Sequence, residues 1–333
     1  MSSDPILLQS AKVRANVYRT GALLTDVAFL LGHGQWVQPL ATPTWQDTPE
    51  QGRLGHMRRL GGEFFCLPFG GSGMVNQPTE GWEDFIALPS NPLLHGPCAN
   101  EDWSVNASEH NEVTLQLHFP QDHAIQFVER RIKLSEAQSR IDIEIQINAR
   151  RSALVPAAFH PILRLPEVTG ELTLEAEFSL GLTYPGIIES DRMVTEPGRE
   201  FRALAQAPRR HGGTVDLGRL PLGPAMEDVI LMAGMRTPVR ANFTREGFCV
   251  VLDWNRKQLP HCMVWIHDRG IDSEPWAGQY RGVGLEPMAA AFDGPWDLST
   301  KSNPLNAKGY TTAIKLEPNA AARLSCSISV EDL

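Results

Sequence analysis

The feature that most constrains this chain is a strict alternation of apolar and polar residues over residues 140–147. Isoleucine stands at every second position, with charged or amide residues between. Because side chains alternate between the two faces of a β-strand, this pattern predicts a strand with one face buried in a core. Three further stretches repeat the period, at residues 112–119, 171–179 and 323–330.

Two denser apolar stretches, residues 248–254 and 262–268, predict central strands that are buried on both faces. The 28 glycines and 25 prolines interrupt the sequence often, and no long segment has helical periodicity. A short helix is expected over residues 199–206. We therefore predict an all-β fold, a large antiparallel β-sandwich with few short helices, built as a single domain over residues 1–333.

The composition argues against several classes of partner. The formal net charge of −9 leaves no basic surface for nucleic acid, so no such partner is expected. No apolar run approaches the roughly 18 residues of a membrane span, and residues 1–21 contain no apolar signal segment. The five cysteines form no CxxC pair, which favours buried free thiols. We predict a cytoplasmic protein with no membrane partner.

Three short segments, far apart in the sequence, carry residues suited to proton transfer. They contain His95, His160 and Glu286, and each of these is followed directly by glycine or proline. A proline biases the residue before it toward extended backbone, which suits a side chain presented from the end of a strand. Two imidazoles and a carboxylate can move protons on and off a sugar hydroxyl and ring oxygen near neutral pH. We expect the three to converge in a groove of the folded sheet.

The order of these motifs in an all-β chain resembles that of the aldose 1-epimerase (galactose mutarotase-like) family. The segment around His95, with Trp103 downstream, is similar to the family's first histidine motif. Phe159-His160-Pro161 is similar to the second, and Gly284-Leu285-Glu286-Pro287-Met288 to the glutamate motif near the C-terminus. The resemblance extends from about residue 14 to the end of the chain. It implies a galactose mutarotase-like supersandwich and an isomerase that exchanges sugar anomers.

The resemblance and the chemistry of anomer exchange together imply a role for each residue. Glu286 is expected to act as the base at the anomeric hydroxyl, His160 as the acid at the ring oxygen, and His95 as a second partner of the ring oxygen. No metal and no organic cofactor is expected. The acid that contacts sugar hydroxyls in the family has two candidate counterparts here, Glu227 and Asp228. The family's early arginine motif has no clear counterpart in residues 56–73.

Further residues are predicted to contact the sugar: Asn100, Trp103, Glu227, Asp268, Trp276 and Arg281. Trp276 is the preferred aromatic wall because it lies in a polar, turn-rich segment just before Glu286. The other tryptophans considered are Trp265 and Trp296, and His267 forms an adjacent pair with Asp268. The partner is predicted to be a small-molecule sugar of open identity. A phosphate or sulfonate on that sugar would require an arginine, and the candidates are Arg59, Arg164, Arg269 and Arg281.

Two alternatives to a mutarotase remain open from the sequence. One is a catalytically idle carbohydrate-binding protein of the same fold. The other is a metal-dependent enzyme in which two histidines and one carboxylate bind the ion. The oligomeric state, monomer or homodimer, is also open, because an exposed edge strand can build a dimer.

Overall fold

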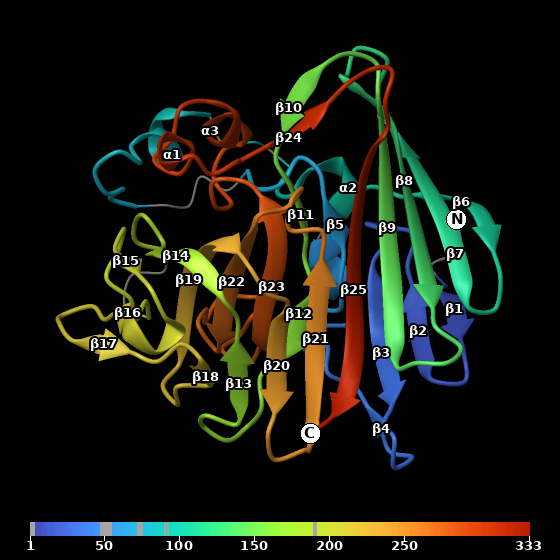
Figure 1. Cartoon of the computed structure of the whole chain (residues 1–333), viewed down its shortest axis with the longest axis horizontal. Helices are drawn as coiled ribbons and strands as arrows, with labels where there is room; N and C mark the ends of the chain where they lie inside the picture. Colours follow the sequence, from blue (N-terminus) through green and yellow to red (C-terminus); the bar gives the residue numbers. More distant parts are fainter. Residues whose placement is uncertain (1–3, 47–54, 72–75, 90, 92, 189–191) are drawn as a thin grey trace.

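A computed structural model describes residues 4–46, 55–71, 76–89, 91, 93–188 and 192–333 of the chain. Two large antiparallel sheets dominate it, as the alternating pattern predicted (Figure 1). The larger sheet has nine strands, in the order β18 (Arg219–Leu220), β13 (Leu172–Glu175), β20 (Val239–Phe243), β21 (Phe248–Trp254), β25 (Ala322–Asp332), β9 (Arg140–Ala149), β8 (Ile125–Leu134), β7 (Glu112–His118) and β6 (Ser104–Ser108).

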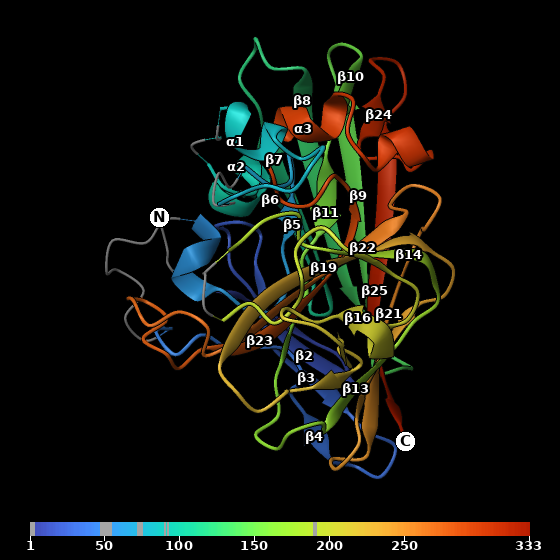
Figure 2. The same ribbon diagram turned by 90° about the vertical axis from the view of Figure 1, so that its left-hand side faces the viewer.

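The second sheet has eight strands. Their order is β15 (Glu200–Phe201), β14 (Phe178–Thr183), β19 (Met226–Met235), β22 (His261–Asp268), β23 (Arg281–Ala289), β11 (Ala157–Phe159) and β5 (Phe65–Cys66), with β12 (Ile162–Arg164) also paired to β23. Figure 2, turned by 90°, shows β19, β22 and β23 crossing in front of the long strands β9 and β25.

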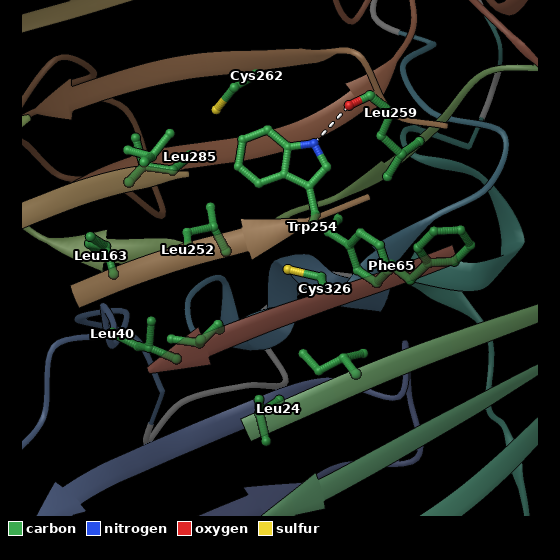
Figure 3. Packing of buried hydrophobic residues seen from close by; sticks show 14 of the residues in the cluster. Leu24, Leu40, Phe65, Leu163, Leu252, Trp254, Leu259, Cys262, Leu285 and Cys326 are labelled. Carbon is green, nitrogen blue, oxygen red and sulfur yellow. Dashed lines mark hydrogen bonds between the residues drawn. The ribbon is translucent and has the colours of Figure 1, made fainter. Parts of the chain in front are cut away.

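The main core fills the space between the two sheets (Figure 3). The isoleucines of β9 are at most 1% exposed and pack into it, which confirms the orientation expected from their alternation. The indole N–H of Trp254 donates a 2.7 Å hydrogen bond to the carbonyl of Leu259, so this large side chain enters the core without an unpaired donor. One buried ion pair crosses the core, from Arg130 on β8 to Glu63, and both side chains are fully buried.

Smaller elements surround the sandwich. Four strands form a separate sheet, β1 (Ile6–Gln9), β2 (Val13–Val17), β3 (Leu24–Leu30) and β4 (Trp36–Val37). Two-strand pairs join β10 (Ala153–Val155) to β24 (Ile314–Leu316) and β16 (Ala207–Pro208) to β17 (Thr214–Val215). The described helices are short: α1 (Asp84–Ala87), α2 (Gly96–Asn100), α3 (Trp296–Thr300) and the 3-10 turns η1 (Gly55–Arg59), η2 (Leu204–Gln206) and η3 (Asn306–Lys308). None of the described helices combines the length and apolar character of a membrane span.

Two expectations from the sequence need correction. The stretch at 171–179 is not one strand, because the chain leaves the nine-stranded sheet after Glu175 and enters the eight-stranded sheet at Phe178. The helix expected over 199–206 is reduced to the single turn η2. Before that turn, β15 pairs with β14, and the ring of Phe201 lies over Gly181, where an added Cβ would come within 2.3 Å of it. Packing of this ring fixes an extended backbone there in place of a helix.

Candidate active site

The strand register gathers polar side chains on the face of the eight-stranded sheet opposite the main core. Glu227 on β19 lies directly across from His267 on β22, and Glu286 on β23 lies across from Met263 on β22. The residues that alternate with these, such as Ile266 and Leu285, point into the main core. The site therefore stands on the outer face of three adjacent strands.

His160 reaches this face from the short link between β11 and β12. Its backbone N–H donates to the carbonyl of Phe64 at 2.9 Å, and the Phe64 ring stacks on the imidazole with centroids 4.5 Å apart. Nε2 of His160 then lies 3.3 Å from Oε1 of Glu286. Neither carboxyl oxygen of Glu286 has a hydrogen-bond partner among the described residues, and Nδ1 of His160 has none either. The two groups are close enough to exchange a proton and have free positions for a ligand.

His95 completes the group from the turn that begins α2. Its backbone adopts the left-handed conformation with φ of 62°, and its N–H donates to the carbonyl of Gly70. The next residue must be glycine, because a Cβ on Gly96 would come within 2.4 Å of the Leu67 carbonyl oxygen. The imidazole centroids of His95 and His160 are 5.2 Å apart. The three separate sequence segments thus converge, as the sequence analysis expected.

Burial sets the charge state of this group. It lowers the pKa of His160 to about 3 and the pKa of His95 well below its usual value. It also raises the pKa of Glu286 well above its usual value, and the nearby negative charge of Asp293 adds to this shift. Near neutral pH both imidazoles are therefore uncharged, and burial favours the protonated form of the Glu286 carboxyl group.

The fold has counterparts among solved structures. No protein-family model and no curated protein sequence matches this chain. Structures that do match over the whole chain include the GalM/aldose epimerase homologue from C. elegans, with a TM-score of 0.66 and 13% identity over 100% of both chains. A protein from Escherichia coli K12, described as a candidate aldose 1-epimerase, matches with a TM-score of 0.65 and 13% identity over 99% of both chains. The galactose mutarotase-like protein from Lactobacillus casei matches with a TM-score of 0.60 and 14% identity over 98% of this chain and 100% of that chain.

The chain has the galactose mutarotase-like fold. At 10–14% identity this likeness establishes architecture and leaves the chemistry to be argued from the site. Within the galactose mutarotase-like sandwich, the described residues include no group of three histidine, cysteine, aspartate or glutamate side chains arranged to hold a metal ion.

A second set of polar groups, which we call the distal cluster, lies on the same face and consists of Glu227, His267 and Tyr280. Nδ1 of His267 is 3.6 Å from Oε1 of Glu227, and the indole N–H of Trp265 donates to that oxygen at 3.2 Å. The ring of Trp276 stacks on His267 with centroids 4.7 Å apart. Of the two acids considered, Glu227 therefore lies on the face of the site, and Trp276 lies against His267 of the same cluster.

Asp228, the other acid considered, faces the opposite direction. Its carboxylate accepts hydrogen bonds from the backbone N–H of Val194 and from the N–H and hydroxyl of Thr195, all at 2.8 Å. Burial nevertheless raises its pKa to about 6. Asp228 anchors the neighbouring segment and has no contact with the site.

The structure does not bring three of the predicted sugar contacts to the site. Trp103 is fully buried in the main core, and its indole N–H donates to the carbonyl of Cys98 at 3.0 Å. Asp268 and Arg281 point to the face opposite His267 and bind each other, with Nε of Arg281 2.8 Å from the Asp268 carboxylate. For Asp268 and Arg281 the reason is strand alternation, because neighbours on one strand cannot share a face.

Asn100 lies near the site, but its side chain bonds to the backbone of the turn that carries His95. Its side-chain amide donates to the carbonyls of Leu94 and Gly96, both at 2.7 Å, and so closes the turn that presents His95. Its side-chain oxygen lies 3.1 Å from Nδ1 of His56. Asn100 is therefore placed to position His95, and its amide group is occupied within the protein.

Several residues of the site were not singled out from the sequence. His56 is buried with its ring 5.3 Å from that of His95, and burial lowers its pKa to about 4. Phe64 is sandwiched between His56 and His160. Trp45 and Tyr280 lie beside Trp276 with ring centroids 5.2 and 5.3 Å from it. The available signal was the cluster of aromatic and glycine residues in 56–73, which gave no indication of which rings face the site.

Proposed function

We propose that this protein is an aldose 1-epimerase, or mutarotase, that interconverts the α and β anomers of a free hexose or a related sugar by acid–base ring opening. The observation that carries the proposal is the approach of His160 Nε2 to Glu286 Oε1 at 3.3 Å, while neither carboxyl oxygen has a hydrogen-bond partner in the part of the chain that the structure describes. A buried carboxyl group without partners is costly, by about 1–3 kcal/mol for each unsatisfied group. Sugar hydroxyls are suited to supply the missing hydrogen bonds.

The reaction requires one proton to leave the anomeric hydroxyl and one to reach the ring oxygen. In the proposed mechanism the free enzyme carries one proton on the Glu286 carboxyl group, whose protonated form burial favours. When sugar hydroxyls donate to the Glu286 oxygens they stabilise the carboxylate, and this proton passes to His160. Glu286 then takes the proton from O1, the C1–O1 bond becomes a carbonyl, the bond from C1 to the ring oxygen breaks, and the ring oxygen takes the proton from His160. Rotation about C1–C2 and reversal of these steps gives the other anomer.

In this proposal His95, which lies beside His160, holds the ring oxygen while the bond breaks, since its Nδ1 is buried and has no hydrogen-bond partner among the described residues. Each step of general acid or base catalysis is typically worth about 10²–10⁴-fold in rate. The sequence of steps returns the pair to its starting protonation state and consumes no co-reactant. Five buried free thiols are consistent with our proposal that the protein works in the reducing cytoplasm.

The test is anomer exchange measured by saturation-transfer NMR on a panel of free hexoses and pentoses. We expect wild-type protein to accelerate α/β exchange of at least one sugar, and the Glu286→Gln variant to lose about 10²–10⁴-fold of that acceleration. Glu144→Gln is the matched control, because Glu144 lies on the exposed face of the nine-stranded sheet, 61% exposed. Sugar binding without acceleration would support the idle binding protein instead, and activity that disappears with a chelator and returns with a metal would support the metal enzyme.

A further inference from the structure

The distal cluster contains more unpaired polar atoms than a purely structural cluster should. Both ring nitrogens of His267, Oε2 of Glu227 and the hydroxyl of Tyr280 are buried and lack a hydrogen-bond partner among the described residues. The side chain of His267 is fully buried and that of Glu227 is 7% exposed. Since buried polar groups in native proteins are normally paired, four unpaired atoms in one place indicate a position where a ligand supplies the partners.

The distance of this cluster from Glu286 follows from two glycines on β23. A Cβ on Gly284 would stand 2.7 Å from Oε1 of Glu286, and a Cβ on Gly282 would stand 3.2 Å from the hydroxyl of Tyr280. The two polar groups therefore lie near positions two residues apart on one strand, and such positions are spaced by roughly 6–7 Å. This is about the width of one pyranose ring. The glycines leave room for the ring, and Trp265 lies across from Gly284 as an apolar surface.

We infer that His267, Glu227 and Tyr280 bind the end of the sugar remote from C1 and require an uncharged hydroxyl there, so that the site takes neutral aldoses and rejects sugars with a phosphate or sulfonate at that end. The inference rests on the proposed function for the orientation of the sugar. A hydroxyl donates to the Glu227 carboxylate and accepts from Tyr280 or His267. An anion would meet the Glu227 carboxylate in a buried site, where repulsion between like charges is strong.

The arginines considered from the sequence do not offset this negative charge. Arg269 and Arg281 both bind Asp268 on the opposite face of the sheet. Arg164 pairs with Glu246, and the guanidinium of Arg59 lies over the ring of Tyr18. Each of these cations thus has a partner of its own away from the distal cluster, whereas a phosphate site in a protein is typically built on arginine forks.

The experiment compares a free hexose with its 6-phosphate and its 6-deoxy derivative, in wild-type protein and in Glu227→Gln, with Glu144→Gln as control. We expect kcat/KM of wild type to favour the free hexose over the 6-phosphate by at least about 100-fold, and Glu227→Gln to reduce that ratio at least about tenfold. His267→Phe should lower kcat/KM for the free hexose about tenfold or more, and kcat/KM for the 6-deoxy sugar much less. A change in the ratio between substrates cannot arise from general loss of folded protein.

Two results would overturn the inference while leaving the proposed function intact. One is equal or better turnover of the 6-phosphate, and the other is that the variants change kcat/KM for all three sugars by the same factor. If no sugar is turned over, the proposed function fails and the inference is decided by binding. Trp265 and Trp276 lie against His267, so their fluorescence reports occupancy of the distal cluster. The inference is supported if the free hexose quenches this fluorescence, the 6-phosphate does not, and Glu227→Gln abolishes the quenching. Equal quenching by both sugars would refute it.

Discussion

Substitution of Gly284 by alanine tests the geometry of the site without removing any functional group. The added Cβ would come within 2.7 Å of Oε1 of Glu286, closer than side-chain carbons approach other atoms in proteins. To reach van der Waals contact the carboxyl group must retreat by about 0.7 Å. That movement changes its 3.3 Å approach to His160 and its reach to the sugar.

Misplacement of a catalytic group by about 1 Å can cost about 10²-fold in rate. We therefore expect Gly284→Ala to lower kcat by roughly 10- to 100-fold, which corresponds to about 1.4–2.7 kcal/mol of activation free energy. The free energy of unfolding should change by less than about 1 kcal/mol, because alanine restricts the unfolded chain more than glycine does and so offsets part of the strain.

The assay is anomer exchange by NMR, with urea unfolding measured on the same preparations. Gly282→Ala serves as the comparison, because its Cβ would press on Ile162 and Tyr280 at 2.9–3.2 Å and leave Glu286 untouched. We expect that variant to change KM more than kcat. A folded Gly284→Ala protein with kcat within twofold of wild type would show that the position of the Glu286 carboxyl group does not control the reaction.

Three further results follow from the structure. The value of kcat/KM should stay high as the pH falls toward 4 and decline only near the lowered pKa of His160, about 3. The reason is that a second proton on the pair of His160 and Glu286 removes the base. A decline centred at the ordinary histidine pKa of about 6.5 would contradict this. Arg130→Met should destabilise the fold by about 3–5 kcal/mol in urea unfolding, because it leaves Glu63 charged and buried. A second change, Glu63→Leu, should restore most of that loss. Equal or greater loss in the double variant would count against an isolated ion pair. Trp254→Phe should lower the free energy of unfolding by about 1–3 kcal/mol or more, because the carbonyl of Leu259 loses its donor. A loss below about 0.5 kcal/mol, roughly the scatter of such values, would mean that the hydrogen bond contributes little.

The sequence predicted the architecture where a local pattern carries the information. The isoleucine alternation of β9 determined both the strand and its buried face, and the motifs around His95, His160 and Glu286 marked segments that meet. The expectation of strand ends holds for His160 but is wrong for Glu286, which lies inside β23. The broken strand at residues 171–179 was not predictable in this way. Its alternation continues without interruption across the point where the chain passes from one sheet to the other.

The predicted sugar contacts show the same limit. Neighbouring residues of β22 point to opposite faces, so His267 and Asp268 could not both line the site, yet an apolar strand gives no signal of which face is which. Only the pairing of Glu227 with His267 across β19 and β22 decides it. Likewise, nothing local distinguishes Trp103, which fills the main core, from Trp276, which stacks on His267.

The proposed mechanism requires His160 and Glu286 to exchange one proton and to act as a unit. Anomer-exchange rates of His160→Gln, Glu286→Gln and the double variant form a cycle that tests it directly. For groups that act together, the second substitution removes little more than the first, so we predict that the double variant retains nearly the same kcat/KM as the weaker single variant. Losses that multiply, each substitution reducing the rate by its own full factor, would show that the two residues act independently and would contradict this mechanism.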